Sequence, residues 1–371
     1  MLSSQIHKRI NFNFDKQKLI FDTSQELFSF AKVDEGTKEL LNSLRKNPSL
    51  DYRKALDLGC GYGVIGIFIK NKFKDSNVLC TDRDSLAAEF TTHNAELNSV
   101  NIKATPSLDF REITGKFSLI LTNFPAKLEK QGLEYFIAKS SEYLEKEGTL
   151  ALVIVKELND FMEEILKNEK ILVPFKEKTK SYSIYHLKFS EIITPEIEPY
   201  YSNEFIYNID KTSYKIKTSN SLQEFDTPHF ITQLLSELIS KYSEKEKVTI
   251  INPNQGFLPL AILNFLSAKE ILLSSRDLLS LKICKENLIL NNFSDISLDN
   301  SDFPQNTGDL LIWSLHDEGT KEILEKLVVF RKNFKKIALG GRIQVINRVL
   351  RTARIEPKKI LKQEKYCAVE L

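Results

Sequence analysis

The stretch KALDLGCGYGVIGIFI, residues 54–69, combines a short apolar strand, a glycine-rich turn and the apolar start of a helix. Gly59, Gly61 and Gly63 can take positive φ, and because they carry no Cβ they let a ligand approach the main chain closely. A nucleotide-like ligand is the natural candidate for such a turn. A tight strand-to-helix connection also uses glycine, so the rest of the chain has to decide between the two interpretations.

A carboxylate stands at the distance expected for a nucleotide-binding turn. The second strand is predicted at residues 77–82 and ends in Asp82, nineteen residues after Gly63. In doubly wound folds an acidic residue at about this distance accepts hydrogen bonds from ribose hydroxyls, because the two strands end at the same edge of the sheet. The alternative is that Asp82 is the N-cap of a helix over residues 85–97. The glycine turn favours the ribose interpretation.

Strands and helices alternate over the first half of the chain. The pattern predicts a strand ending near Asp109, an apolar strand running into Asn123-Phe124-Pro125-Ala126, a turn at Glu147-Gly148, and further elements at residues 10–14, 19–21, 38–44, 133–146, 149–155 and 182–189. This rhythm indicates an α/β fold with a mostly parallel sheet, helices on both faces and ligands at the carboxyl ends of the strands.

The composition is that of a globular protein with two domains. The chain has 371 residues, of which 42% are hydrophobic and 27% charged, and its net charge is +2. This length supports two separate cores. No run of eighteen apolar residues occurs, and residues 1–18 are polar. We therefore expect neither a transmembrane helix nor a signal peptide, and a soluble, cytoplasmic protein.

The cysteines and histidines lack the spacing of a metal site. They are scattered singly, at Cys60, Cys80, Cys284, Cys367, His7, His93, His186, His229 and His316. We predict no metal, and we expect the cysteines to be reduced and mostly buried.

The second half of the sequence repeats the first. Asn208-Ile209-Asp210-Lys211 and Thr218-Ser219 match residues 13–16 and 23–24 at an offset of 195. Ser275-Arg276-Asp277, Asn287 and Asn291 match residues 82–84, 94 and 98 at an offset of 193. The preserved order argues for a duplicated domain. We predict domains at residues 1–194 and 195–371, with a linker at Pro195, Glu196 and Pro199.

The second copy lacks the residues that single out the first. The run VTIINPNQGF, residues 248–257, occupies the place of the glycine run, retains one glycine and sets Asn252 against Asp57. Ser275 stands in the place of Asp82, and Ser314-Leu315-His316 in the place of Asn123-Phe124-Pro125. We therefore expect the second domain to be degenerate and unable to hold the same ligand.

Positive charge is concentrated near the end of the sequence. Residues 331–365 contain twelve Lys or Arg against Glu356 and Glu364, a net charge of +10. A basic stripe of this size can meet phosphates. A solvated face balanced by acidic residues elsewhere is an equally good interpretation.

Asp-Leu-Gly-Cys-Gly-Tyr-Gly at residues 57–63, Asp82, and Asn-Phe-Pro-Ala at residues 123–126 resemble class I methyltransferases that use S-adenosylmethionine. Within that class the chain looks most like the small-domain family of ribosomal RNA guanine-N2 methyltransferases. The resemblance covers roughly residues 19–190 and includes Val33-Asp34-Glu35-Gly36-Thr37. It implies two tandem Rossmann-like methyltransferase domains. Several relatives carry the degenerate domain first, whereas here it comes second and would position the substrate.

The resemblance also implies a reaction and its residues. The reaction is methyl transfer from S-adenosylmethionine to an exocyclic amine of an RNA base, most closely guanine N2 in ribosomal RNA, with free RNA or a ribosomal subunit as partner. Asn123, Phe124 and Pro125 would be catalytic, and Asn123 and the Phe124 carbonyl would accept the two N–H bonds of the amine. The cofactor-binding residues would be Asp57, Gly59, Cys60, Gly61, Gly63, Asp82, Arg83 and Asp109.

One departure from the family pattern concerns the base. The usual strand end is Asn-Pro-Pro followed by Phe or Tyr, whose ring stacks on the base, whereas here Phe124 and Ala126 hold the second and fourth positions. Losing one such stack costs about 1–3 kcal/mol. Either Phe124 or Tyr135 supplies a ring, or the acceptor is not guanine. Two other functions stay open: a non-catalytic cofactor- or RNA-binding assembly factor, and a methyltransferase acting on protein or a small molecule.

Overall fold

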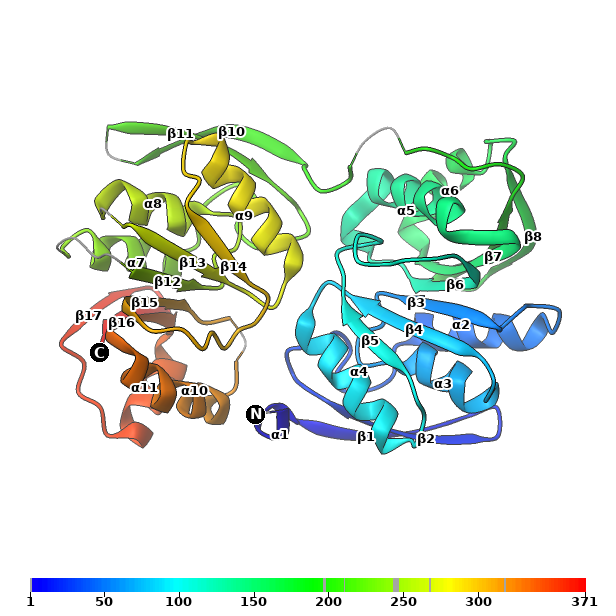
Figure 1. Ribbon diagram of the computed structural model, residues 1–371, viewed down its shortest axis with the longest axis horizontal. Helices are drawn as coiled ribbons and strands as arrows, with labels where there is room; N and C mark the ends of the chain where they lie inside the picture. Colours follow the sequence, from blue (N-terminus) through cyan, green and yellow to red (C-terminus); the bar gives the residue numbers. More distant parts are fainter. Residues whose placement is uncertain (1, 196–197, 210, 243–246, 267, 317) are drawn as a thin grey trace. The chain divides into compact units, whose positions relative to one another are not determined.

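The computed structural model describes residues 2–195, 198–209, 211–242, 247–266, 268–316 and 318–371. The chain forms two compact units, Leu2–Pro199 and Tyr200–Leu371, which we call the N-terminal unit and the C-terminal unit (Figure 1). The predicted boundary between residues 194 and 195 lies five residues before this division. Glu196 of the predicted linker and Asp210 of the repeat lie outside the described residues.

The N-terminal unit contains an antiparallel hairpin and a seven-stranded sheet. The sheet order is β5-β4-β3-β6-β7-β9-β8, with parallel pairing from β5 to β7 and antiparallel pairing of β9 and β8. The strands of the hairpin are β1 (Lys8–Phe14) and β2 (Gln17–Thr23). The strands of the sheet are β3 (Lys54–Leu58), β4 (Asn77–Asp82), β5 (Lys103–Pro106), β6 (Phe117–Asn123), β7 (Leu144–Val155), β8 (Ile171–Lys178) and β9 (Tyr182–Phe189). Its helices are α1 (Leu2–Gln5), α2 (Glu35–Lys46), α3 (Val64–Lys72), α4 (Ser85–Leu97), η1 (Ala126–Leu128), α5 (Glu129–Tyr143), η2 (Lys156–Leu158) and α6 (Asn159–Ile165). The predicted α/β fold is confirmed.

Buried side chains of this sheet alternate between two cores. On β6, Leu119 and Leu121 pack with the hairpin and with α2, α3 and α4, whereas Ile120 packs with α5 and α6. Both faces of the sheet are therefore covered, which explains why β6 is apolar along nearly its whole length. Because β3, β4 and β6 are parallel neighbours, their carboxyl ends meet at one edge.

The C-terminal unit has the same architecture. Its sheet order is β14-β13-β12-β15-β16-β18-β17, again parallel except for the last two strands. Its strands are β10 (Asn203–Ile209), β11 (Thr212–Thr218), β12 (Lys247–Ile251), β13 (Glu270–Ser274), β14 (Ile296–Asp299), β15 (Gly308–Ser314), β16 (Phe334–Arg342), β17 (Lys359–Gln363) and β18 (Tyr366–Glu370). Its helices are α7 (Phe230–Ile239), α8 (Phe257–Phe265), α9 (Leu278–Leu290), α10 (Thr320–Asn333) and α11 (Ile343–Ala353).

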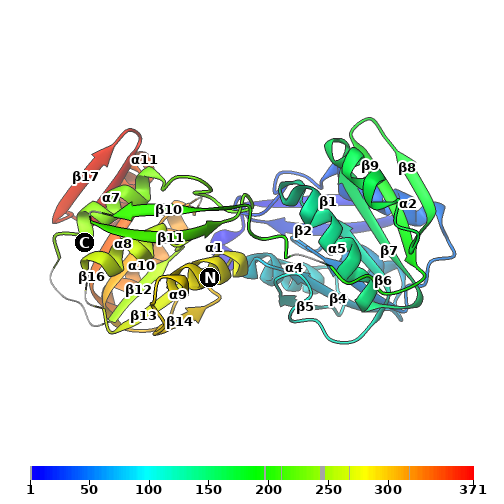
Figure 2. The same ribbon diagram turned by 90° about the horizontal axis from the view of Figure 1, so that it is seen from above.

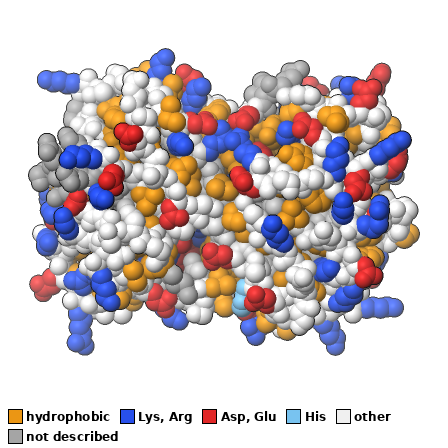
Figure 3. Space-filling model, in the orientation of Figure 1, with side chains coloured by type: hydrophobic (Ala, Val, Ile, Leu, Met, Phe, Trp, Pro, Cys, Tyr) orange, Lys and Arg blue, Asp and Glu red, His pale blue; other side chains and the backbone are white. Residues whose placement is uncertain are grey.

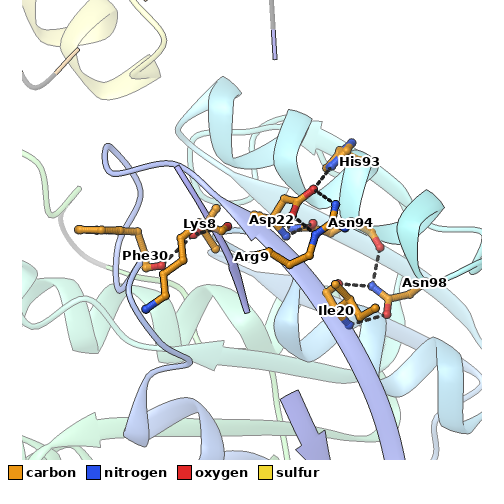
Figure 4. Close-up of polar contacts among 9 residues, drawn as sticks. Lys8, Arg9, Ile20, Asp22, Phe30, His93, Asn94 and Asn98 are labelled. Atoms are coloured by element: carbon orange, nitrogen blue, oxygen red, sulfur yellow. Dashed lines mark hydrogen bonds and ion pairs between the residues drawn. The ribbon is translucent and has the colours of Figure 1, made fainter. Parts of the chain in front are cut away.

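Asn94 of α4 and Asn98, the C-cap of that helix, hold the hairpin of the N-terminal unit. The Asn94 carboxamide accepts from the Asp22 amide at 2.8 Å and donates to the Asp22 carbonyl at 3.0 Å. Asn98 makes the same pair of bonds with Ile20, at 2.9 and 2.6 Å (Figure 4). Strand β2 thereby gains polar partners along the edge that faces α4.

Asn287 of α9 and Asn291, the C-cap of that helix, do the same in the C-terminal unit. Asn287 accepts from the Lys217 amide at 2.8 Å and donates to its carbonyl at 2.7 Å. Asn291 binds the backbone of Lys215 in the same way. Figure 2 shows each hairpin beside the helices of its own unit. The matched pairs follow the offsets of 195 and 193, so the duplication extends to individual hydrogen bonds.

Some predicted boundaries are wrong. The strand expected to end near Asp109 ends at Pro106, and Asp109 lies in the following turn with φ 53°. Helix α5 ends at Tyr143, and β7 begins at the next residue, so the expected turn at Glu147-Gly148 lies inside the strand. The pairing with β6 shifts register here, from Phe117–Leu144 to Leu119–Thr149, and Glu147 takes φ 64°, so the expected turn is a bulge within the strand. Strand β8 is an edge strand that the sequence pattern does not predict.

Two simpler expectations concern the whole described chain. All four cysteines are free and buried, as predicted. Within the described ranges, no helix has the length and apolar character needed to cross a membrane.

Candidate active site

Neighbouring elements hold the glycine turn between β3 and α3 from its inner side. The Gly59 amide donates to the Thr81 carbonyl on β4 at 2.8 Å. From α4, the Thr91 hydroxyl donates to the Gly61 carbonyl at 2.9 Å. The path of the turn is thus fixed by the protein itself.

The three glycines of the turn have different surroundings. At Gly63, the N-cap of α3 with φ 95°, an added Cβ would lie 2.9 Å from Ile67 Cδ1 and 3.0 Å from the Thr91 side chain. At Gly59 (φ 77°) and Gly61 (φ 55°), an added Cβ would meet no described atom within 4 Å. Packing therefore requires Gly63, whereas Gly59 and Gly61 present their backbone to open space.

Asp82 stands beside this open side of the turn. Its Oδ2 accepts from the Gly61 amide at 2.9 Å and its Oδ1 from the Asp84 amide at 3.0 Å. The N-cap of α4 is Asp84, whose side chain accepts from the Leu86 amide, so the N-cap alternative for Asp82 is wrong. Arg83 is half-buried between the two aspartates.

Asp57 and Cys60 point away from the open side. The Asp57 carboxyl is 1% exposed, and its Oδ2 accepts from the Gly66 amide of α3 at 2.8 Å. Its Oδ1 has no hydrogen-bond partner among the described residues. Burial raises the pKa of Asp57 to about 7, partly offset by the Gly66 hydrogen bond and reinforced by the charge of Asp82. The Cys60 thiol is also buried, so both residues can affect a ligand only through the turn.

Asn123 is the last residue of β6, the parallel neighbour of β3. Asp57 on β3 pairs with Leu121 on β6, so each chain is two residues past the same pair at Gly59 and at Asn123. The Asn123 Nδ2 donates to Asp34 Oδ2 at 2.9 Å and to Thr37 Oγ1 at 3.1 Å.

These two bonds orient the Asn123 carboxamide. Asp34 is the N-cap of α2, and its Oδ2 also accepts from the Thr37 amide at 3.1 Å. With both N–H groups of Asn123 donated to α2, its Oδ1 is left as the acceptor that the half-buried side chain can offer. The site therefore combines a cradle of bare backbone, a carboxylate and an oriented amide oxygen.

The aromatic rings near Asn123 are buried. Phe124 is 3% exposed, packs in the core under α5 and meets the Phe136 ring at 5.8 Å. Tyr135 is 7% exposed, and its hydroxyl donates to Asp109 Oδ2 at 3.1 Å. Neither ring is presented for stacking on a base, so neither Phe124 nor Tyr135 supplies the missing ring. Pro125, at the surface, carries no aromatic ring that could replace them.

Asp109 faces inward rather than toward the glycine turn's open side. Its carboxylate is 1% exposed and bonds to the Phe110 amide as well as to Tyr135, with Arg111 Nε 3.8 Å away. Its φ of 53° places it in a tight turn after β5. A contact between Asp109 and an adenine amine stays a prediction.

The corresponding turn of the C-terminal unit corrects the sequence alignment. The Asn252 amide donates to the Ser274 carbonyl at 2.9 Å, as Gly59 does to Thr81, and Gly256 with φ 102° is the N-cap of α8. Asn252 therefore corresponds to Gly59 and not to Asp57, whose counterpart is Ile250. The sequence alignment is offset by two residues because α7 is two residues shorter than α2, 10 residues against 12.

Side chains fill the space above this second turn. Asn252 Nδ2 donates to the Ser314 carbonyl at 2.8 Å and to Glu318 Oε1 at 3.1 Å. Glu318 is buried, which raises the pKa of its carboxyl. Ser314 is the counterpart of Asn123, so the position open in the first unit is closed by Asn252 in the second.

Sequence reasoning did not identify Asp34 and Thr37 as site residues. A signal was present, because an aspartate before an amphipathic helix is a typical N-cap and Thr37 follows three residues later. Nothing local indicates that this cap faces Asn123, which is 89 residues away in the chain. That contact depends on the packing of α2 against β6 and β7.

Comparison with known proteins adds three findings. A family model of the methyltransferase small domain matches residues 18–186. The uncharacterized protein YbxB of Bacillus subtilis (strain 168) is 33% identical over 149 residues, which are 39% of this chain and 73% of that protein. The ribosomal RNA small subunit methyltransferase C of Pseudoalteromonas atlantica is 32% identical over 163 residues, 43% of this chain and 46% of that protein. The match thus spans less than half of the latter.

One solved structure covers both units. The T. thermophilus 16S rRNA N2 G1207 methyltransferase (RsmC), in complex with AdoMet and guanosine, matches with a TM-score of 0.70 at 15% identity. The match covers 99% of this chain and 98% of that chain. At this identity the likeness establishes the fold, two tandem Rossmann-like units.

Proposed function

This chain belongs to the methyltransferase small-domain family, and on that premise we propose that it transfers a methyl group from S-adenosylmethionine to an exocyclic amine of an RNA base, guanine N2 in ribosomal RNA. One observation carries the proposal: the open glycine turn, Asp82 and the oriented oxygen of Asn123 stand at the carboxyl ends of adjacent strands. Ligands of doubly wound sheets bind at that edge. The reaction takes place in the cytoplasm, where ribosomal RNA is found.

The residues at the turn fit the cofactor. The space above Gly59 and Gly61 is the kind of cradle that a Cβ would fill, and Asp82 is the acceptor for ribose hydroxyls. When bound, S-adenosylmethionine would supply a methyl group on a sulfonium sulfur: the C–S bond breaks as the acceptor nitrogen takes the methyl, S-adenosylhomocysteine leaves, and the nitrogen loses one of its two protons to water. Asp57 and Cys60 act indirectly, by fixing the turn from below.

Asn123 positions the acceptor amine. Its Oδ1 and the Phe124 carbonyl accept the two N–H bonds, which directs the nitrogen lone pair toward the methyl group. Asp34 and Thr37 are positioning residues, because they hold the carboxamide with its oxygen toward the amine. Orientation of this kind supplies a large share of catalysis in a displacement between two bound reactants.

The C-terminal unit supplies the contact with RNA phosphates. Helix α11 buries Ile346, Val349 and Leu350 against its sheet and exposes Arg348 and Arg351 on the other side. In Figure 3, Lys and Arg side chains lie over the region of α11. Within the described chain, the ion pairs of the basic segment are those of Lys335 with Asp309 and of Lys336 with Glu370, so most of its charge is not neutralised locally.

The salt dependence of binding tests this contact. Changing Arg348→Ala together with Arg351→Ala is expected to weaken RNA binding and to reduce the slope of log K against log salt by about one for each phosphate that the variant no longer binds. Lys335→Ala is the matched control, because Lys335 already has an acidic partner at 2.6 Å. An unchanged slope in the double variant would contradict the assignment.

Labelled methyl transfer tests the reaction itself. The full chain is incubated with tritium-labelled S-adenosylmethionine and either transcribed ribosomal RNA or assembled subunits, and the product is digested to nucleosides. Label in N2-methylguanosine is the expected result. Label in protein or in a small molecule would assign a different acceptor, and cofactor binding without transfer to any acceptor would favour a non-catalytic assembly factor.

A further inference from the structure

Phe28 is the most exposed large hydrophobic side chain in the described ranges, at 73%. It lies in the loop of residues 24–34 that joins β2 to α2. A single exposed apolar residue is ordinary on a protein surface and by itself indicates nothing. Phe28 differs from an ordinary exposed residue because it lies on an anchored loop that contacts the proposed site.

The loop is held firmly on both sides of Phe28. Leu27 is 5% exposed and belongs to the core. The Thr23 hydroxyl donates to the Phe30 carbonyl at 2.8 Å, and Lys8 Nζ donates to the Ala31 carbonyl at 2.7 Å. Figure 4 shows Lys8 and Phe30 on this side of the hairpin. The Phe28 ring is therefore displayed from an anchored backbone, which limits the loss of entropy when the ring meets a partner.

The same loop connects the two halves of the site. The Tyr62 hydroxyl, from the middle of the glycine turn, donates to the Ser29 and Lys32 carbonyls at 3.4 Å each. Two residues after Lys32, Asp34 accepts from the Asn123 carboxamide. Phe28 precedes Ser29 directly, so its ring is carried by the segment that runs from the turn to the acceptor-binding asparagine.

The C-terminal unit retains the loop but not the ring. The Thr218 hydroxyl donates to the Phe225 carbonyl at 2.6 Å, as Thr23 does to Phe30, and Glu224 takes φ 63° where Ser29 takes φ 54°. By the same offset of 195, the counterpart of Phe28 is Gln223. At this one position, the unit with an open glycine turn thus carries an exposed phenylalanine, and the unit with a filled turn carries an amide, although the second loop exposes Phe225 two residues further on.

We propose that Phe28 stacks on the acceptor base and replaces the ring that the family usually carries at the position of Ala126. This inference rests on the proposed function. Phe124 and Tyr135 are buried and cannot stack, so a purine held at Asn123 would otherwise meet no aromatic face from these positions. Stacking by Phe28 contributes to binding of the RNA and not to binding of the cofactor.

Steady-state kinetics of the full chain test the contribution. Phe28→Ala is expected to raise KM for RNA by roughly 10- to 100-fold while the Kd for S-adenosylmethionine, measured by calorimetry, stays unchanged. Phe28→Tyr keeps an aromatic face and should stay close to the parent. Phe225→Ala, at an exposed phenylalanine on the corresponding loop, is the matched control and should change neither constant. An unchanged KM in Phe28→Ala, or an equal loss of cofactor binding, overturns the proposal.

A fluorescence experiment separates this proposal from the proposed reaction. The chain has one tryptophan, Trp313, which is fully buried in the C-terminal unit. Phe28→Trp therefore adds an exposed reporter, and guanosine added with S-adenosylhomocysteine should quench its emission saturably. Phe225→Trp should show no such quenching. A parent chain that methylates no RNA overturns the proposed reaction. Absence of quenching in Phe28→Trp overturns the stacking role, whether or not the parent chain methylates RNA.

Discussion

The turn at residues 57–63 and its counterpart at residues 250–256 share a backbone path and differ in what lies above it. Both bind the carbonyl of the neighbouring strand, and both end in a glycine N-cap, with φ of 95° at Gly63 and 102° at Gly256. Asparagine tolerates φ near 50–60° but not near 100°. The fold therefore requires glycine at the last position of the turn in both units.

The two units differ in sequence at the other two glycine positions of the turn. Gly59 and Gly61 are replaced by Asn252 and Asn254, which take φ values of 58° and 49°, also positive, against 77° and 55° at the glycines. The backbone alone therefore does not need glycine there. What Gly59 and Gly61 provide is space for a ligand, and the comparison distinguishes a glycine needed for folding from a glycine needed for binding.

Exchanging residues between the units tests this distinction, and the largest effect is expected at Asn123. Asn123→Ser installs the residue of Ser314 and removes the amide oxygen that accepts from the amine. We expect kcat for methyl transfer to fall about 10²- to 10³-fold, as when one fixed hydrogen-bonding group is removed from an active site, with cofactor binding unchanged. Single-turnover transfer and calorimetry measure the two quantities.

The reverse exchange is the control for that experiment. Ser314→Asn places an asparagine where Asn252 and Glu318 already fill the space, so activity should equal that of the parent. Normal transfer by Asn123→Ser would show that the end of β6 does not take part in the reaction.

The second exchange concerns the glycines. Gly59→Asn combined with Gly61→Asn installs the residues that the C-terminal unit carries at the same positions of its turn, with φ in the range that asparagine tolerates. The protein should fold with little change in Tm, while the Kd for S-adenosylmethionine rises by on the order of 100-fold, because side chains now occupy the cradle. A large fall in Tm would mean that the fold needs these glycines, and tight binding would mean that the ligand does not approach them.

The sequence predicted the repeating architecture well, because it depends on periodicity and on local signals. The β/α alternation, the hairpins and the glycine turn each depend on residues that are close together in the sequence. The duplication was detectable because Asn94, Asn98, Asn287 and Asn291 bind backbone atoms, so their identity is tied to the fold.

The site was predictable only in part. Asp82 and Asn123 lie at the expected strand ends, but the partners of Asn123 come from α2, a helix whose packing the sequence does not specify. The burial of Phe124 could not be predicted from the sequence either, because an apolar ring after a buried strand can face either the core or the surface. Asn252 was paired with the wrong residue because the helix before the strand is two residues shorter in the second copy, a difference that the sequence pattern does not reveal.

The third exchange is Asp82→Ser, which installs the residue that the C-terminal unit carries at the corresponding position, Ser275. The Asp82 carboxylate accepts from the Gly61 and Asp84 amides, and in the proposal it also binds the ribose. We expect the Kd for the cofactor to rise about 10-fold, the effect of one hydrogen bond to a charged group. Binding calorimetry measures it, and Ser275→Asp, which leaves Asn252 in place, should create no second site. A lower Tm with an unchanged Kd would reduce Asp82 to a structural role.

The smallest effect is expected at Asp57, whose counterpart is the apolar Ile250. The folded pKa of Asp57 is about 7, against an ordinary value of 3.8, so the folded state binds more protons between these values and Asp57 contributes less to stability as pH rises through that window. His186, buried against Ser43 and Asn47, has its pKa lowered to about 4, and its contribution falls as pH drops from 6.5 toward 4.

The two groups therefore oppose each other between about pH 4 and pH 6.5. Asp57→Asn keeps an acceptor for the Gly66 amide but removes the titration, so the His186 contribution is no longer offset. We expect the variant to lose more Tm than the parent on acidification from about pH 7 to about pH 5, by several degrees. Asp57→Asn combined with His186→Gln is the control and should show a flatter profile than the single variant. Parallel profiles of Asp57→Asn and the parent would show that Asp57 is ionised beneath the turn, and that the first unit carries a true charge where the second has none.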